Sequence, residues 1–344
     1  MTMNPRAADD DRLDPRVRAA LARWPLDLAT DVASRDAMVA EASSPEGRRA
    51  AALEADFMND ADNEEVAPSE GLSLTKRSFE APAGHTLNLQ VIRPKGSEVL
   101  PCVYFIHGGA MTTLSCFYGN YRAWGKILAA QDVVVVMIDF RNAVVPSSVA
   151  EVAPFPAGLE DCVAGLEWVH ARAQELAIDP ERVVVAGESG GGNLTLALGL
   201  TLKRDDKLSL IRGLYAMCPY LNGQWPDERY PSSAEFNGYG LELHSNRGAV
   251  GYGVDAFNER NPLAWPGFAT VEDLRGLPPT VISVNECDPL RDEGVAFYRR
   301  LLEAGVAARG RVVLGTTHAI ELYPTVCPDL TFATANDLVD FAFS

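Results

Sequence analysis

The sequence lacks any long hydrophobic run, because its longest uninterrupted aliphatic stretch covers only 133–138. A helix that crosses a bilayer needs about 20 mostly apolar residues, so we expect neither a membrane span nor a membrane partner. The first residues, MTMNPRAADDDR, carry acidic side chains where an export signal has basic and then apolar ones. These absences favour a cytoplasmic protein.

Basic residues are scarce, and the patterns that hold metals or phosphates are missing. The chain has 30 Lys and Arg against 47 Asp and Glu, and its net charge of −17 repels nucleic-acid phosphates, which argues against nucleic acid as a partner. There is no H-E-x-x-H motif, no C-x-x-C pair and no phosphate-binding loop with its lysine, so we expect no metal and no organic cofactor. The cysteines are far apart, as buried free thiols are: Cys102, Cys116, Cys162, Cys218, Cys287 and Cys327.

Apolar residues are plentiful, at 47% of the 344 residues, which is enough for one large core. Strand-like and helix-like segments alternate from residue 78 on, and this predicts an α/β fold with a mostly parallel central sheet and helices on both of its faces. Strands are expected at 87–92, 99–106, 133–138, 182–186, 210–218, 280–284 and 311–314, and helices at 158–173, 190–202, 294–304 and the carboxy-terminal tail.

Two segments depart from this alternation. Residues 1–75 contain several short helical patterns and predict an amino-terminal helical cap segment. Residues 219–261 are rich in Gly, Tyr, Asn and Trp and are too long for a simple loop. We therefore expect 219–261 to be a second cap element, inserted into the main domain 76–344.

The motif G-x-S-x-G occurs at 187–191, between a predicted strand and a predicted helix. This context is typical of a nucleophile elbow, in which the serine occupies a strained turn and the flanking glycines avoid collisions with neighbouring backbone. Ser189 is therefore a candidate nucleophile. In the alternative interpretation, the serine only caps the helix that follows.

A serine hydroxyl needs a base to remove its proton and a carboxylate to orient that base. Among the five histidines, His318 follows the last predicted strand, at the sheet edge where catalytic loops gather in α/β folds. Asp288 comes directly after the strand at 280–284 and is the favoured acid. Glu286 and Asp292 are its competitors.

A loop with few side chains, His107-Gly108-Gly109-Ala110, follows the strand predicted at 99–106. Acyl transfer passes through an oxyanion that backbone N–H groups stabilise, and a glycine-rich loop can present such donors. We expect His107 to fix the loop by hydrogen bonding rather than to act as a catalyst. A merely flexible glycine turn is the alternative.

These motifs occur together with 139–143 (DFRNA), 154–162 (PFPAGLEDC) and 288–294 (DPLRDEG). From near Pro94 onwards the sequence thus resembles the α/β-hydrolase fold and, within it, the hormone-sensitive-lipase-like family of carboxylesterases. The resemblance implies a serine esterase whose catalytic domain is 76–344, with a helical cap.

The resemblance also implies a role for each matching residue. It makes Ser189 the nucleophile, Asp288 the orienting acid and His318 the base, with the amides of Gly109, Ala110 and Gly190 as oxyanion-hole donors. The chain departs from the family pattern at Ala110, where a third glycine is usual, at Glu188, where aspartate is commoner, and at 319–321. Glu188 is expected either to form a hydrogen bond near the nucleophile or to be solvated.

The predicted reaction is the hydrolysis of short-to-medium acyl esters through an acyl-enzyme, with a small-molecule ester as the partner. An amidase or a lactonase would use the same triad, and a non-catalytic small-molecule receptor is the alternative of another class. A homodimer stays open. Residues expected to line the substrate pocket, unless they only pack the cap onto the core, are Gly108, Met111, Phe117, Tyr118 and Tyr239, with Trp225 and Phe236 as further aromatic candidates.

Overall fold

The central feature of the fold is an eight-stranded sheet with the strand order β1-β2-β4-β3-β5-β6-β7-β8. It is seen in a computed structural model that describes residues 5–22 and 30–344. β2 pairs antiparallel with β1 and β4, whereas the remaining neighbours pair in parallel, which confirms the predicted mostly parallel sheet. The strands are β1 (Leu72–Glu80), β2 (Thr86–Pro94), β3 (Leu100–Ile106), β4 (Val134–Asp139), β5 (Ile178–Glu188), β6 (Gly213–Met217), β7 (Thr280–Asn285) and β8 (Ala308–Val313).

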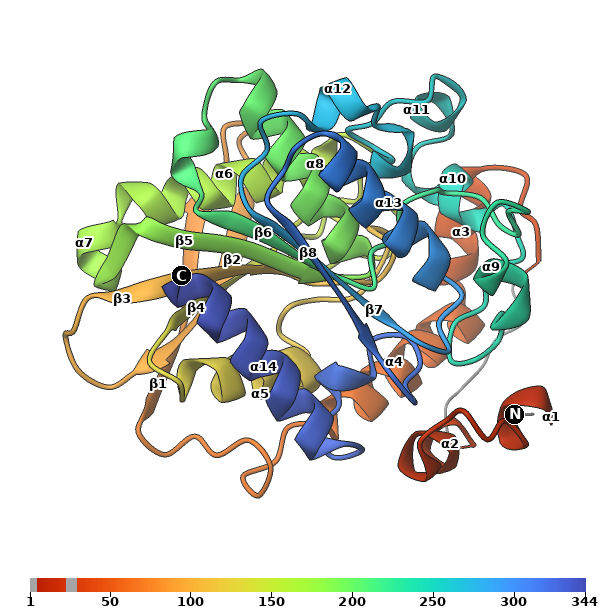
Figure 1. The fold of residues 1–344 in the computed structure, drawn as a ribbon, viewed down its shortest axis with the longest axis horizontal. Coiled ribbons are helices and arrows are strands. Elements are labelled where there is room, and N and C mark those ends of the chain that lie inside the picture. Colours follow the sequence, from red (N-terminus) through yellow and green to blue (C-terminus); the bar gives the residue numbers. More distant parts are fainter. Residues whose placement is uncertain (1–4, 23–29) are drawn as a thin grey trace.

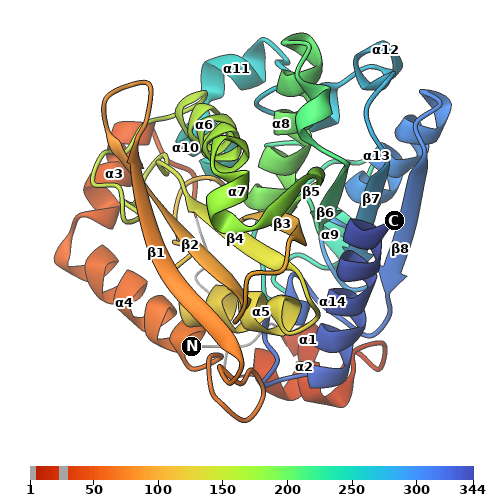
Figure 2. The same ribbon diagram turned by 90° about the vertical axis from the view of Figure 1, so that its left-hand side faces the viewer.

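Helices cover both faces of this sheet, as the sequence predicts (Figures 1 and 2). On one face lie α6 (Ala157–Ala171), α8 (Gly190–Arg204) and α13 (Arg291–Glu303), with the short helices α7 (Ala173–Leu176) and α12 (Val271–Leu274) at its margins. On the other face lie α5 (Gly119–Ala129) and α14 (Pro328–Phe343). Within the described ranges, no helix combines the length and apolarity that crossing a membrane requires.

Each face of the sheet has its own hydrophobic core. Along β4, Val134 and Val136 point into the core beneath α6 and α8, whereas Val135 and Met137 point into the core beneath α5 and α14. A strand covered on both sides has no polar face, which explains why residues 133–138 form one unbroken apolar run. All six cysteines are buried and free, as expected for cysteines within apolar segments.

The edge strand β1 differs from the sequence-based expectation. It begins at Leu72, inside the segment 1–75 that is predicted to be helical, and it extends to Glu80. Most of its side chains are exposed, including those of Lys76 and Arg77. Charged side chains on an edge strand discourage pairing with other molecules, and here they also remove the apolar pattern by which a strand is recognised.

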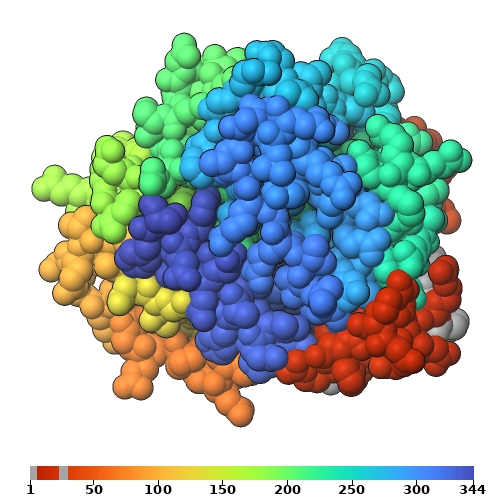
Figure 3. All heavy atoms as spheres, in the orientation of Figure 1, coloured from red at the N-terminus to blue at the C-terminus, as the bar shows by residue number. Residues whose placement is uncertain are grey.

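The amino-terminal helices begin at residues that suit a helix start. They are α1 (Pro5–Ala8), α2 (Pro15–Leu21), α3 (Arg35–Ala42) and α4 (Pro45–Asn59). Asp14, Ser34 and Ser44 accept hydrogen bonds from backbone N–H groups in the first turns of α2, α3 and α4, which stabilises each start. Figure 3 shows the first described residues, in red, lying against the carboxy-terminal part of the chain, in blue.

The segment 219–261 contains the short helices α9 (Ser232–Glu235), α10 (Arg247–Tyr252) and α11 (Val254–Asn258). It contacts the amino-terminal segment, since the Asn246 side chain accepts a hydrogen bond from the Val32 N–H and donates one to the Val32 carbonyl, both at 2.9 Å. The α3 and α10 helices accordingly lie side by side (Figure 1). That 1–75 and 219–261 form a cap distinct from the domain 76–344 stays a prediction.

One buried carboxyl group anchors the start of this insertion. Glu293, on α13, accepts hydrogen bonds from the Leu221 N–H at 2.7 Å, from the Asn222 side chain at 3.0 Å and from the Trp225 indole N–H at 2.7 Å. Nothing in the local sequence around Glu293 reveals these partners, because they lie in another segment of the chain.

We predict that Glu293→Ala lowers the free energy of unfolding by about 3 kcal/mol, because it leaves three buried donors without an acceptor. Urea denaturation followed by circular dichroism measures this change. Glu303→Ala is the matched control, since Glu303 is exposed on the same helix. Equal stability of the two variants would contradict the anchoring role.

Candidate active site

Three side chains from the ends of three strands form one chain of hydrogen bonds. Ser189 follows β5, Asp288 comes after β7 and His318 comes after β8. The His318 Nε2 atom lies 2.9 Å from Ser189 Oγ, and the His318 Nδ1 atom lies 2.8 Å from Asp288 Oδ2. The other Asp288 oxygen accepts a hydrogen bond from the Leu290 N–H at 2.8 Å, which fixes the orientation of the carboxylate. This arrangement can move a proton from the serine hydroxyl to the imidazole.

The turn that carries Ser189 has the strained geometry of a nucleophile elbow. Ser189 has φ +57° and ψ −119°, an unusual conformation for a residue with a side chain. A Cβ atom on Gly191 would lie 2.0 Å from the Ile106 carbonyl oxygen, and one on Gly187 would lie 2.4 Å from the Gly191 carbonyl oxygen. The glycines of the motif are therefore required by the close approach of the backbone, as the sequence analysis expects.

The other histidines and the competing carboxylates bond elsewhere. Glu286 accepts a hydrogen bond from the Gly315 N–H at 2.7 Å, and Asp292 accepts one from the Ser232 N–H at 2.8 Å. The remaining histidine contacts are His85 with Asp161 at 3.0 Å, His107 with the Gly108 carbonyl at 3.0 Å, His170 with the Leu210 carbonyl at 2.6 Å and His244 with the Ser233 carbonyl at 3.0 Å.

The loop after β3 passes directly beside the serine turn. A Cβ atom on Gly190 would lie 2.6 Å from the Met111 nitrogen and 2.8 Å from the Ala110 nitrogen, so no side chain separates the loop from the turn. Gly109, Ala110 and Met111 all have positive φ, at +87°, +52° and +59°. Among the described residues, the Gly109 and Ala110 amides have no hydrogen-bond acceptor. Such unpaired donors can stabilise a developing oxyanion.

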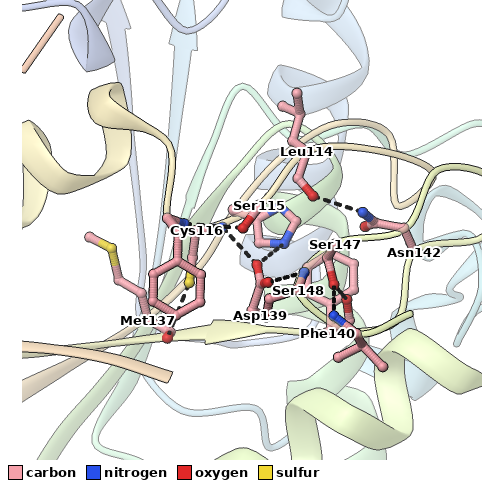
Figure 4. Close-up of polar contacts among 12 residues, drawn as sticks. Leu114, Ser115, Cys116, Met137, Asp139, Phe140, Asn142, Ser147 and Ser148 are labelled. Atoms are coloured by element: carbon pink, nitrogen blue, oxygen red, sulfur yellow. Dashed lines mark hydrogen bonds and ion pairs between the residues drawn. The ribbon is translucent and has the colours of Figure 1, made fainter. Parts of the chain in front are cut away.

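A second set of contacts fixes the far end of this loop (Figure 4). The Asn142 side chain donates to the Leu114 carbonyl at 2.8 Å, and the Asp139 carboxylate accepts from the Cys116 N–H at 2.8 Å and the Ser148 N–H at 2.6 Å. Asp139 and Asn142 both belong to the 139–143 motif. In the sequence this motif indicates only a family resemblance, whereas in the structure its side chains support the loop.

His107 contributes to the same support. Its Nε2 atom lies 3.5 Å from Asp139 Oδ1, and its ring stacks on the Phe140 ring with centroids 4.2 Å apart. Burial lowers the pKa of His107 below its usual value, which favours the neutral imidazole. The structure thus places His107 where it fixes the loop.

The residues expected to line the pocket lie in different surroundings. Met111 is buried in the core, the Phe117 ring lies 5.2 Å from the Lys76 ammonium nitrogen, and Tyr118 directly precedes α5. The Tyr239 hydroxyl donates to Asp10 at 3.1 Å, and its carbonyl accepts a hydrogen bond from the Thr317 hydroxyl. The pocket roles of these residues and of Gly108 stay predictions.

Comparisons with known proteins agree with this geometry. A family profile described as the alpha/beta hydrolase fold matches residues 103–322. The chain is 34% identical over 224 residues to an arylesterase of Saccharolobus solfataricus, which covers 63% of this chain and 67% of that protein.

Two solved structures are similar over nearly the whole chain. Esterase Est22 shares 55% identity with a TM-score of 0.97 and covers 99% of both chains. Brefeldin A esterase, described as a bacterial homologue of human hormone sensitive lipase, shares 35% identity with a TM-score of 0.83 over 97% of this chain and 94% of that chain. The Est22 match includes the amino-terminal segment, where the sequence motifs alone show no resemblance. The chain therefore belongs to the α/β-hydrolase family, as a carboxylic ester hydrolase similar to hormone-sensitive lipase.

Proposed function

We propose that this esterase hydrolyses a small-molecule ester through an acyl-enzyme formed on Ser189. The observation that carries the proposal is the unbroken hydrogen-bond chain from Ser189 through His318 to Asp288. The unpaired amides of Gly109 and Ala110 beside the serine turn support it, because acyl transfer needs a nucleophile and oxyanion donors next to each other.

In the first half of the reaction, His318 Nε2 takes the proton of Ser189 as Oγ attacks the ester carbonyl carbon. The carbonyl oxygen becomes an oxyanion, which the amides of Gly109, Ala110 and Gly190 stabilise. Asp288 remains ionised and stabilises the imidazolium through Nδ1. The oxyanion then collapses, the bond to the alcohol oxygen breaks, and His318 gives its proton to the departing alkoxide.

In the second half, water replaces the serine as the nucleophile. His318 removes a proton from the water while the resulting hydroxide attacks the acyl carbon, and a second oxyanion forms at the same donors. When this oxyanion collapses, the bond to Ser189 Oγ breaks and Oγ recovers its proton from His318. The acid is released and the enzyme returns to its starting state.

Short-to-medium acyl esters are the proposed substrate class. The named arylesterase relative supports an aromatic leaving group in the test substrate, so p-nitrophenyl butyrate is a suitable choice. Anilides and lactones of matched acyl length test the amidase and lactonase alternatives. If anilides or lactones were hydrolysed faster than the ester, the protein would be an amidase or a lactonase instead.

We predict that Ser189→Ala lowers kcat on p-nitrophenyl butyrate by at least ~10³-fold, because the three residues act as a unit. A fluorophosphonate probe should label the wild-type protein and fail to label this variant. Labelling of Ser189→Ala would refute the assignment of the nucleophile. A wild-type protein that resists the probe, yet binds esters reversibly, would instead be a receptor.

We predict that Asp288→Asn lowers kcat by about 10⁴-fold, because an amide neither stabilises the imidazolium nor holds the required tautomer. Glu286→Gln and Asp292→Asn are matched controls, since each neutralises a carboxylate near the end of β7 that does not bond to His318. Steady-state kinetics compares the three variants. If either control variant lost more kcat than Asp288→Asn, the residue changed in that control would be the carboxylate that orients His318.

A further inference from the structure

Glu188, the last residue of β5, extends beneath the serine turn. Side chains alternate along a strand, and Val184 and Ala186 of β5 both point into the core beneath α5 and α14. Glu188 therefore points to the same face, where its side chain is buried. The sequence leaves open whether this carboxyl group is bonded or solvated, and the structure shows that it is bonded.

Glu188 connects the serine turn to the loop that presents the oxyanion donors. The Tyr121 hydroxyl, on α5, donates to Glu188 Oε1 at 2.8 Å and accepts a hydrogen bond from the Gly108 N–H at 3.0 Å. A Cβ atom on Gly108 would lie 2.1 Å from the same Glu188 oxygen, so the loop backbone rests directly on the carboxyl group.

These contacts determine the direction of the peptide groups that follow Gly108. Because the Gly108 N–H is bonded to Tyr121, the chain leaves this point in a fixed orientation and turns through the positive φ of Gly109 and Ala110. We propose that Glu188 is a positioning residue for ester hydrolysis, acting through Tyr121 to hold the amides of Gly109 and Ala110 where the oxyanion forms. This inference rests on the proposed function.

The protonation state of Glu188 also affects the site, because its carboxyl group is buried beside the loop. Burial raises the pKa of Glu188 to about 8, and its Oε2 atom has no hydrogen-bond partner among the described residues. Titratable groups that interact electrostatically with Glu188 include Tyr121 on α5, Tyr323 after the turn Ile320–Leu322, and Cys218 after β6. Burial raises the pKa of all three, so these groups are neutral while Glu188 titrates.

The ionisation of Glu188 determines how kcat changes with pH. Below about pH 8 the Glu188 carboxyl group is protonated and places no charge beside the oxyanion site. Above that pH it ionises, and the nearby negative charge repels the negative charge that develops in the transition state. The wild-type kcat should therefore decline as the pH rises through about 8.

Tyr121→Phe is the most direct test, because it removes one oxygen and keeps the buried ring. We expect kcat on p-nitrophenyl butyrate to fall about 10- to 100-fold, with KM changed by less than about twofold, since misplaced donors weaken transition-state stabilisation. Tyr104→Phe is the matched control, because it also removes a buried hydroxyl, which donates to the Cys162 carbonyl at 2.8 Å away from the site. Equal kcat in the two variants would overturn the proposal.

Substitutions at Glu188 separate positioning from a general effect on packing. Glu188→Gln keeps a neutral group with an acceptor oxygen for Tyr121, so its kcat at pH 7 should stay near that of the wild type, and the decline above about pH 8 should disappear. Glu188→Ala should lose activity as Tyr121→Phe does. The proposal fails if Glu188→Gln loses as much kcat at pH 7 as Glu188→Ala, or if it keeps the alkaline decline.

Failure of this inference is distinguishable from failure of the proposed function. The fluorophosphonate probe reports on the nucleophile, so a wild-type protein that resists it contradicts the proposed function itself. A wild-type protein that reacts, together with a Tyr121→Phe variant that reacts at the same rate, contradicts only the role of Glu188.

Discussion

The active site depends on one constraint, the contact between two backbone segments that leaves no room for a side chain. The Gly191 backbone approaches the end of β3 so closely that a Cβ atom would lie 2.0 Å from the Ile106 carbonyl oxygen. This contact places the serine turn beside the loop that starts at His107. The conformation at Ser189 costs about 1–3 kcal/mol, which the packing of β5 and α8 on both cores must offset.

Support for the loop comes from both ends. Tyr121 and Glu188 fix its start, whereas Asp139 and Asn142 fix its end. The loop that carries His318 is supported differently, because the Asp14 N–H donates to the Gly315 carbonyl at 2.9 Å and thereby connects the amino-terminal helices to it. His318 and the loop at 107–110 are therefore supported by different contacts, and the serine turn contacts both of them.

The sequence predicts the features that rest on local backbone chemistry. The serine turn, the loop at 107–110 and the buried strands each have a short pattern of glycine or apolar residues that one segment contains by itself. Bonds between distant segments have no such pattern: Tyr121 and Glu188 are separated by 67 positions, and Glu293 and Trp225 by 68. Strand β1 lacks a recognisable pattern for another reason, since charged side chains on this edge strand interrupt the alternation of apolar and polar residues.

In the proposed reaction, Ser189 carries the acyl group during turnover. Rapid quenching of the wild-type protein with p-nitrophenyl acetate, followed by proteolysis and mass spectrometry, measures this directly. We expect the peptide containing Ser189 to gain the mass of one acetyl group during the pre-steady state and to lose it when the substrate is exhausted. Turnover with no acetylated peptide, or with acetyl on another residue, would contradict it.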